Sequence, residues 1–199
     1  MKPTLVVIFA ITAIVSAALI LLSNRSNTAM NTATSTCPEA LNFNVKSIDG
    51  EDVNLCRYEG NLVLIVNTAS ECGYTPQYRD LEELNRRYYS RGLRILGFPS
   101  NDFGGQEPGT EAEIKNFCES RYKVTFDMFS KIPVQGEEKH PLYRYLTSGG
   151  GDPNLVGEVQ WNFNKYLIGK DGKLVGRFLS PVEPLSDELT GAIERELEK

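Results

Sequence analysis

The stretch VNTASECGYTPQY at residues 66–78 decides the fold that we predict for this chain. The residues just before and at its start, LVLIV at 62–66, form a continuous apolar run, which is typical of a strand covered on both faces inside a parallel or mixed sheet. Thr75 followed by Pro76 predicts the start of a helix, with the Thr75 hydroxyl capping free backbone N–H groups. The stretch therefore predicts a buried strand, a turn that carries Cys72, and a helix.

Cys72 is the candidate nucleophile because its turn would face the positive end of that helix. Unpaired N–H groups and the helix dipole favour an anion there, so the reactive thiolate would be populated at neutral pH. The alternative, a cysteine that is an inert core thiol after a buried strand, is the commoner case when no motif surrounds it.

The elements that follow predict a parallel crossover. Apolar or aromatic residues at spacings of three and four predict one buried helix face, and they are Tyr78, Leu81, Leu84 and Tyr88. Gly92 should end this helix, and the apolar run 93–98 predicts a second strand. Strand, helix, strand implies a right-handed βαβ unit with parallel pairing.

The rest of the chain extends this order. Residues 43–48 and 52–55 predict a hairpin around Asp49-Gly50, and Thr110 with Glu113 predicts a capping box that opens a helix. Residues 161–168 and 174–179 predict a second hairpin, and 185–197 a final amphipathic helix, whereas 124–134 has no clear pattern and 149–153 is a loop. This order predicts an α/β protein with a thioredoxin-like fold: a mixed central sheet flanked by helices, with an N-terminal β-hairpin.

The N-terminal residues differ in composition from the rest. Residues 4–22 contain no charge, and their length favours a signal-anchor over a cleaved signal peptide, so 1–22 are predicted to be one of these two. Residues 23–36 are predicted to be a Ser/Thr/Asn-rich linker, and 37–199 the folded domain. Both possibilities predict an extracytoplasmic domain, exported or anchored to the membrane by its N-terminal segment.

The charge and the cysteine content limit which ligands and cross-links are expected for this chain. A formal net charge of −5 gives no basic surplus for nucleic acid, and no set of Cys and His has metal-ligand spacing, so neither a metal nor another cofactor is predicted. In an exported domain Cys37 and Cys56 could form a disulfide that staples the N-terminal segment to the first hairpin. Two buried thiols are the alternative.

Three separated stretches resemble the glutathione peroxidase family. They are VNTASECGYTPQY at 66–78, LGFPSNDFGGQEPG at 96–109 and WNFNKYLIGKDG at 161–172, and the similarity covers roughly residues 40–198. The resemblance implies a peroxidatic Cys72 surrounded by Gln106, Trp161 and Asn162. These side chains make chemical sense, because cleaving a peroxide O–O bond leaves an oxyanion that needs hydrogen-bond donors.

The resemblance also implies how the enzyme would be recycled. Cys118 lies where thioredoxin-dependent members carry a cysteine that resolves the sulfenic acid, although the apolar neighbour Ile114 also fits a core thiol. The expected partners are therefore a peroxide substrate and a thioredoxin-like protein or glutathione as reductant. The short segment 136–160 resembles that of monomeric members, whose open sites accept lipid hydroperoxides.

Two other functions remain alternatives. A membrane-tethered thiol redox sensor could use the same Cys72 and Cys118 to pass oxidation to a partner protein. A disulfide oxidoreductase is disfavoured because Thr75, not a cysteine, lies three residues after Cys72.

Overall fold

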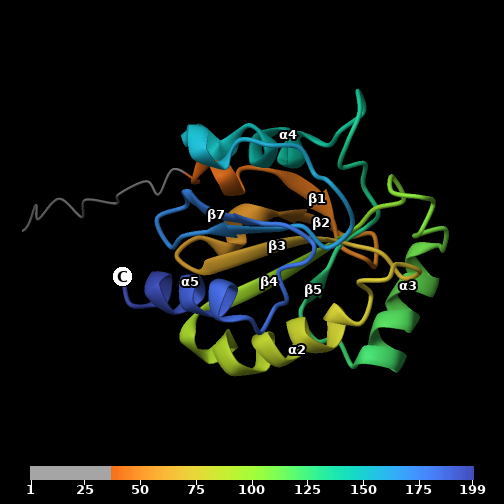
Figure 1. Ribbon diagram of the computed structural model, residues 1–199. Helices are drawn as coiled ribbons and strands as arrows, with labels where there is room; N and C mark the ends of the chain where they lie inside the picture. The colour runs from red at the N-terminus through yellow and green to blue at the C-terminus, as the bar shows by residue number, and fades with distance from the viewer. Residues whose placement is uncertain (1–36) are drawn as a thin grey trace, which may run out of the picture. The chain divides into compact units, whose positions relative to one another are not determined.

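A computed structural model describes residues 37–199, which form one compact unit built on a five-stranded sheet. The spatial order of its strands is β5-β4-β3-β6-β7 (Figure 1). The strands and helices are β1 (Asn44–Lys46), β2 (Asp52–Asn54), β3 (Leu62–Thr68), α2 (Gln77–Tyr88), β4 (Leu93–Pro99), α3 (Glu111–Phe117), β5 (Asp127–Met128), α4 (Pro141–Thr147), β6 (Lys165–Ile168), β7 (Leu174–Phe178) and α5 (Asp187–Leu197). Strands β3 and β4 are parallel, whereas β6 pairs antiparallel with both β3 and β7, so the predicted mixed sheet and βαβ unit are confirmed.

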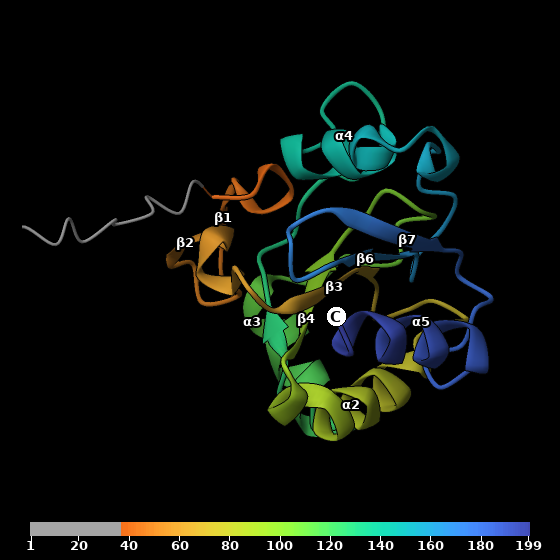
Figure 2. The same ribbon diagram turned by 90° about the vertical axis from the view of Figure 1, so that its left-hand side faces the viewer.

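The central strand β3 is buried at every position, because both faces of the sheet are covered. Leu62, Leu64 and Val66 pack in a cluster with residues of α2 and α5 on one face. Val63 and Ile65 point to the other face, into a cluster with residues of α4 and the first hairpin. Figure 2 shows these layers, with α4 on one side of the sheet and α2 and α5 on the other. The continuous apolar run in the sequence is thus explained by burial on alternate faces.

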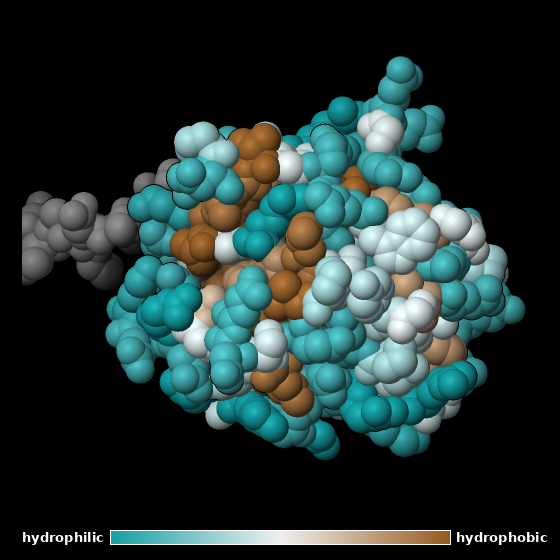
Figure 3. All heavy atoms as spheres, viewed as in Figure 1, coloured by the Kyte–Doolittle hydropathy of each residue, from teal (hydrophilic) through white to brown (hydrophobic). Residues whose placement is uncertain are grey.

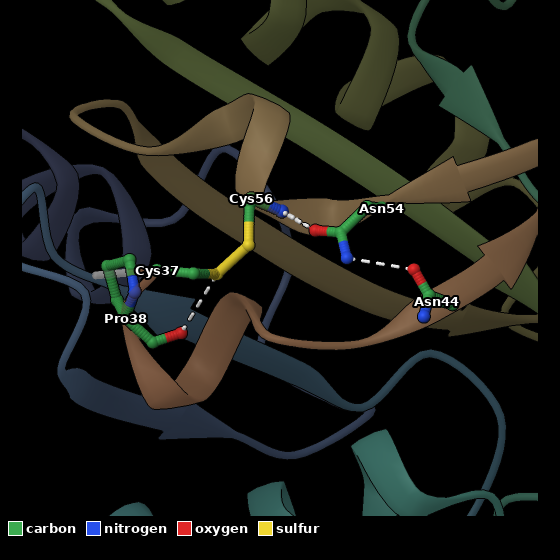
Figure 4. Close-up of a disulfide and its surroundings, with 5 residues drawn as sticks. All are labelled: Cys37, Pro38, Asn44, Asn54 and Cys56. Atoms are coloured by element: carbon green, nitrogen blue, oxygen red, sulfur yellow. Dashed lines mark hydrogen bonds between the residues drawn. A yellow bond between two sulfur atoms is a disulfide. The ribbon is translucent and has the colours of Figure 1, made fainter. Parts of the chain in front are cut away.

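The N-terminal hairpin of β1 and β2 is antiparallel, as predicted, and it lies beside a disulfide. Cys37 and Cys56 are joined, with their Cα atoms 5.5 Å apart, so of the two alternatives for these cysteines the disulfide is the one observed (Figure 4). At the base of the hairpin, the Asn54 side chain donates to Asn44 at 2.8 Å and accepts from the Cys56 N–H at 2.8 Å.

Three local predictions were wrong or incomplete. Thr75 does not cap helix α2, which begins after Pro76 without a side-chain cap. The strand expected at 161–168 begins only at Lys165, because Phe163 has a left-handed backbone (φ 66°) that interrupts it. Helix α4 was not predicted, although His140 and Pro141 form its N-terminus: the His140 ring nitrogen accepts from the Leu142 N–H at 3.2 Å.

The predicted signal-anchor or signal peptide and the linker, residues 1–36, lie outside the described residues. Within residues 37–199 no helix is long and apolar enough to span a membrane.

Candidate active site

The turn between β3 and α2 presents the Cys72 thiol, and Thr75 holds this turn closed. The Thr75 hydroxyl accepts a hydrogen bond from the Cys72 N–H at 2.9 Å and donates one to the Ala69 carbonyl at 2.9 Å. The Tyr74 N–H points at Cys72 Sγ, 3.4 Å away. The turn thus places a backbone N–H donor directly against the sulfur.

The Cys72 side chain is mostly, but not completely, buried. The residue is 7% exposed and belongs to an apolar cluster that also contains Cys118. Trp161 is 39% exposed, one of three large apolar residues with such exposure among those described, and its ring lies 5.5 Å from that of Phe103. On the face shown in Figure 3 hydrophilic side chains cover most of the surface, and hydrophobic ones gather mainly in one region of it. Exposure of so large a ring is therefore uncommon among the described residues.

The loop that carries Gln106 is tied to the Cys72 turn. The Glu71 N–H donates to the Gln106 carbonyl at 3.0 Å, and the Ser100 N–H donates to the Thr68 carbonyl at 3.0 Å. Gly104 and Gly105, both with left-handed φ values of 63° and 64°, turn the chain back between these two anchors. Only glycine adopts two such residues in succession without strain, which explains the Gly-Gly pair before Gln106.

The loop that carries Trp161 and Asn162 is fixed by Asn67 of strand β3. The Asn67 side chain donates to the Trp161 carbonyl at 3.1 Å and accepts from the Asn164 N–H at 3.0 Å. The backbone carbonyl of Asn67 accepts from the Phe163 N–H at 2.6 Å. The left-handed conformation of Phe163 costs energy for a residue with a side chain. These bonds, and the edge-to-face packing of the buried Phe163 ring on Tyr78 (centroids 5.4 Å apart), hold it in place.

The two loops meet through their side chains. Asn162 Nδ2 donates to Gln106 Oε1 at 3.0 Å, although the residues are 56 positions apart. This bond orients the Gln106 amide, and within residues 37–199 neither Gln106 Nε2 nor Trp161 Nε1 donates a hydrogen bond to the protein. The loops that carry Gln106, Trp161 and Asn162 thus meet beside the Cys72 turn at one end of β3.

Cys118 lies at the start of a π-helical turn, Cys118–Tyr122, that continues α3. It is 1% exposed, and burial raises the pKa of its thiol to about 11. Cys72 and Cys118 are both free thiols and share one apolar cluster. In this state Cys118 is a protonated, buried thiol, which fits an unreactive resting form.

Glu107 and Asn67 are site features that were not predicted. Glu107 is fully buried beside Gln106, neither carboxylate oxygen has a hydrogen-bond partner in the described residues, and burial raises its pKa to about 7. Both lie inside the motif stretches, but an acid in a polar loop and an Asn at a strand end carry no distinctive local pattern. No group of three or more potential metal ligands occurs in the part of the chain that the structure describes.

The sequence matches known proteins over most of the folded unit. A family model described as "Glutathione peroxidase" matches residues 40–147. The "Hydroperoxy fatty acid reductase gpx1" of Synechocystis sp. is 48% identical over 158 residues, covering 77% of this chain and 92% of that protein. The "Thioredoxin/glutathione peroxidase BtuE" of Escherichia coli is 44% identical, covering 71% of this chain and 89% of the relative.

Solved structures with the same fold include members of this family. A structure described as "Crystal structure of Trgpx in apo form" has a TM-score of 0.64 and 35% identity, and the match covers 80% of this chain and 96% of that one. A thioredoxin-family thiol:disulfide interchange protein from Chlorobium tepidum shares the fold with a TM-score of 0.57 at 15% identity, covering 83% of this chain and 99% of that one. The thioredoxin-like fold is confirmed. The curated relatives carry enzyme names, which give no support to the alternative of a redox sensor.

Proposed function

Because the chain belongs to the glutathione peroxidase family and is a peroxidase, we propose that Cys72 is its peroxidatic nucleophile and Cys118 its resolving thiol. Gln106, Trp161 and Asn162 would then stabilise the charge that develops on the leaving oxygen. The observation that carries the proposal is the meeting of two distant loops at the Cys72 turn, through the Asn162–Gln106 and Glu71–Gln106 hydrogen bonds.

In the first step the Cys72 thiolate attacks one peroxide oxygen. The S–O bond forms as the O–O bond breaks, and the departing oxyanion takes a proton to leave as water or an alcohol. Lowering a thiol pKa from about 8.5 to about 6 gains only about two- to threefold in rate at pH 7, because a weaker base is also a weaker nucleophile. Most of the acceleration must therefore come from N–H donors that stabilise the transition state.

In the second step the Cys118 thiolate attacks the Cys72 sulfenic acid. The S–S bond forms, the S–O bond breaks, and hydroxide leaves with a proton as water. Since Cys118 is buried at the start of a π-helical turn, this segment must open before the two sulfurs can bond. A dithiol then reduces the disulfide by two thiol–disulfide exchanges.

The reductant we propose is a thioredoxin-like protein, with glutathione as the second possibility. A resolving cysteine gives the oxidised enzyme an intramolecular disulfide, which a dithiol reduces in one encounter. The similar Escherichia coli protein is named for both thioredoxin and glutathione, and the Synechocystis relative for hydroperoxy fatty acids. We propose hydrogen peroxide and organic or lipid hydroperoxides as substrates.

We also propose that the domain works outside the cytoplasm as a monomer. The uncharged stretch at 4–22 supports export, and so does the Cys37–Cys56 disulfide, since disulfides persist in oxidising compartments. Size-exclusion chromatography and fractionation of cells that express the full chain test these two points. Recovery of the protein in the cytoplasm would contradict the first, and a stable dimer would contradict the second.

A coupled assay of the full chain tests the enzymatic proposal. Thioredoxin with its reductase, or glutathione with its reductase, is supplied as donor, and hydrogen peroxide or a phospholipid hydroperoxide as acceptor. Cys72→Ser should abolish turnover with every pair. Cys118→Ser should retain one fast oxidation by peroxide but lose turnover with thioredoxin. Full thioredoxin-dependent activity in either variant rejects the corresponding role.

A further inference from the structure

Helix α3 and its π-helical extension are attached to the rest of the unit by few fully buried side chains. Across Glu111–Phe117 and Cys118–Tyr122 the buried residues are only Ile114 and Cys118. The capping box of Thr110 and Glu113 stabilises the helix itself, but not its attachment. Phe117 and Tyr122 are partly buried against the same core cluster, so apolar contacts hold one side of the segment and polar interactions at its exposed edge add to them.

Two hollows separate α3 from the first hairpin. One, of about 330 Å³, is lined by Ile48, Phe126 and Cys118, and the other, of about 530 Å³, by Gly50, Glu111 and Asn116. Asp49 and Lys115 line both hollows. Between these hollows the side chains of Asp49 and Lys115 meet and join the hairpin to α3.

That pair is a bidentate ion pair. Lys115 Nζ lies 2.7 Å from Asp49 Oδ1 and 2.8 Å from Asp49 Oδ2. Lys115 is three residues before Cys118, so it holds the turn of helix that precedes the thiol. A second acid, Glu119, is 4.0 Å from Lys115, but it belongs to the same segment and moves with it.

The hairpin turn that carries Asp49 is firmly attached to the body of the protein. The Ile48 N–H donates to the Met128 carbonyl at 2.9 Å, at the end of strand β5. Ser130 donates from its N–H to the Lys46 carbonyl at 2.9 Å and from its hydroxyl to the Ser47 carbonyl at 2.8 Å. Asp49 is therefore a fixed point on the body of the protein, against which Lys115 holds α3.

We propose that Asp49 and Lys115 form a latch that controls how often the α3 segment opens, and thereby how fast Cys118 reaches oxidised Cys72. The inference rests on the resolving role proposed above for Cys118. Both latch residues are positioning residues, since neither touches the reacting sulfurs. Because the pair is exposed, breaking it should raise the open population about 1.5- to 5-fold.

Stopped-flow oxidation of the full chain separates the two steps, with the fluorescence of Trp161, the only tryptophan, as the signal. The first phase depends on peroxide concentration, and the second, disulfide formation, does not. Lys115→Met and Asp49→Asn should each speed the second phase about 1.5- to 5-fold and leave the first phase unchanged. The double variant should be no faster than either single one, and 1 M salt should remove most of the difference, because salt screens exposed charges.

Lys46→Met is the matched control. Lys46 forms an exposed ion pair with Asp52 at 2.8 Å within the same hairpin, without any bond to α3. Its loss should leave both phases unchanged. A second phase that stays the same or slows in Lys115→Met and Asp49→Asn overturns the latch, and so does an equal acceleration in Lys46→Met.

A labelling experiment separates failure of the latch from failure of the resolving role. In the Cys72→Ser background, Cys118 is the only free thiol among the described residues, and its rate of alkylation measures opening directly. Lys115→Met should accelerate labelling by the same factor as the second phase, and unchanged labelling overturns the latch. If labelling accelerates but the second phase persists in Cys118→Ser, the latch stands and the resolving role is wrong.

Discussion

Replacing Thr75 by valine should damage both the stability of the protein and its reaction with peroxide. Valine has nearly the same shape as threonine and is also β-branched, so it fills the same space in the turn. Thr75 is 5% exposed, so water cannot replace its hydroxyl. The change therefore leaves the Cys72 N–H and the Ala69 carbonyl without the partners that they have at 2.9 Å.

The size of the effect follows from these two bonds. Each buried group left without a partner costs about 1–3 kcal/mol, so the loss of both bonds should lower the free energy of unfolding by about 2–6 kcal/mol. Thr75→Ser keeps the hydroxyl and loses one methyl group, which should cost about 1 kcal/mol. Guanidinium denaturation of the full chain, with the unfolding free energy extrapolated to water, measures both variants.

The same pair of variants tests the chemistry. The Cys72 N–H bond sets the direction of the turn, including the Tyr74 N–H that points at Sγ. We expect the second-order rate constant with hydrogen peroxide to fall about ten- to hundredfold in Thr75→Val, because small displacements of reacting groups slow a reaction by such factors. The rate constant should change little in Thr75→Ser. If Thr75→Val unfolds within about 0.5 kcal/mol of the parent protein, the hydroxyl does not support the turn, and our reasoning is refuted.

Three further predictions concern pH and the disulfide. Because burial raises the pKa of Cys118 to about 11 in the closed state, the rate of disulfide formation after oxidation of Cys72 should rise about tenfold per pH unit between pH 7 and 9. A plateau of this rate near pH 8.5 in quenched-flow measurements would show that the thiol is not buried before it reacts. Burial raises the pKa of Glu107 from 4.5 to about 7. Its contribution to the free energy of unfolding is therefore fully present below pH 4.5 and is lost as the pH rises through 7, by about 3 kcal/mol. Urea titrations of Glu107→Gln should lack this loss, and an unchanged pH dependence of stability in that variant contradicts the assignment. Replacing both Cys37 and Cys56 by serine removes a cross-link between positions 19 apart and should lower the free energy of unfolding by about 3 kcal/mol. Denaturant titrations under oxidising conditions measure this difference. Equal stability with and without the disulfide would contradict the loop-entropy explanation.

Much of the fold could be predicted because its signals are local. The apolar runs at 62–66 and 93–98, the helix between them and the Asp49-Gly50 turn each specify one element, and the order of elements then leaves few topologies. The Thr110–Glu113 capping box was predicted correctly for the same reason, since both partners lie within one helical turn. Helix α4 was missed because only seven residues form it, too few for a clear periodic pattern.

Thr75 shows where local reasoning fails. A threonine before a proline is a good capping residue in any sequence, but here its hydroxyl is used by Ala69 and Cys72 within the turn. Phe163 is a similar case. Its segment has the composition of a strand, and only the bonds to Asn67, in a strand 96 positions away, impose its left-handed backbone.

The sequence alone determined the candidate residues, because each lies in a recognisable stretch and its chemistry depends on residue type. Only the tertiary structure decided how they are arranged: that Asn162 bonds Gln106, that Cys118 is buried in the resting state, and that Asp49 pairs with Lys115. Nothing in the sequence around Glu107 indicates that its carboxyl group is buried and its pKa raised, as the fold makes them. The physical reason is that burial, hydrogen bonding and charge pairing depend on which distant segments meet, and no local pattern records those meetings.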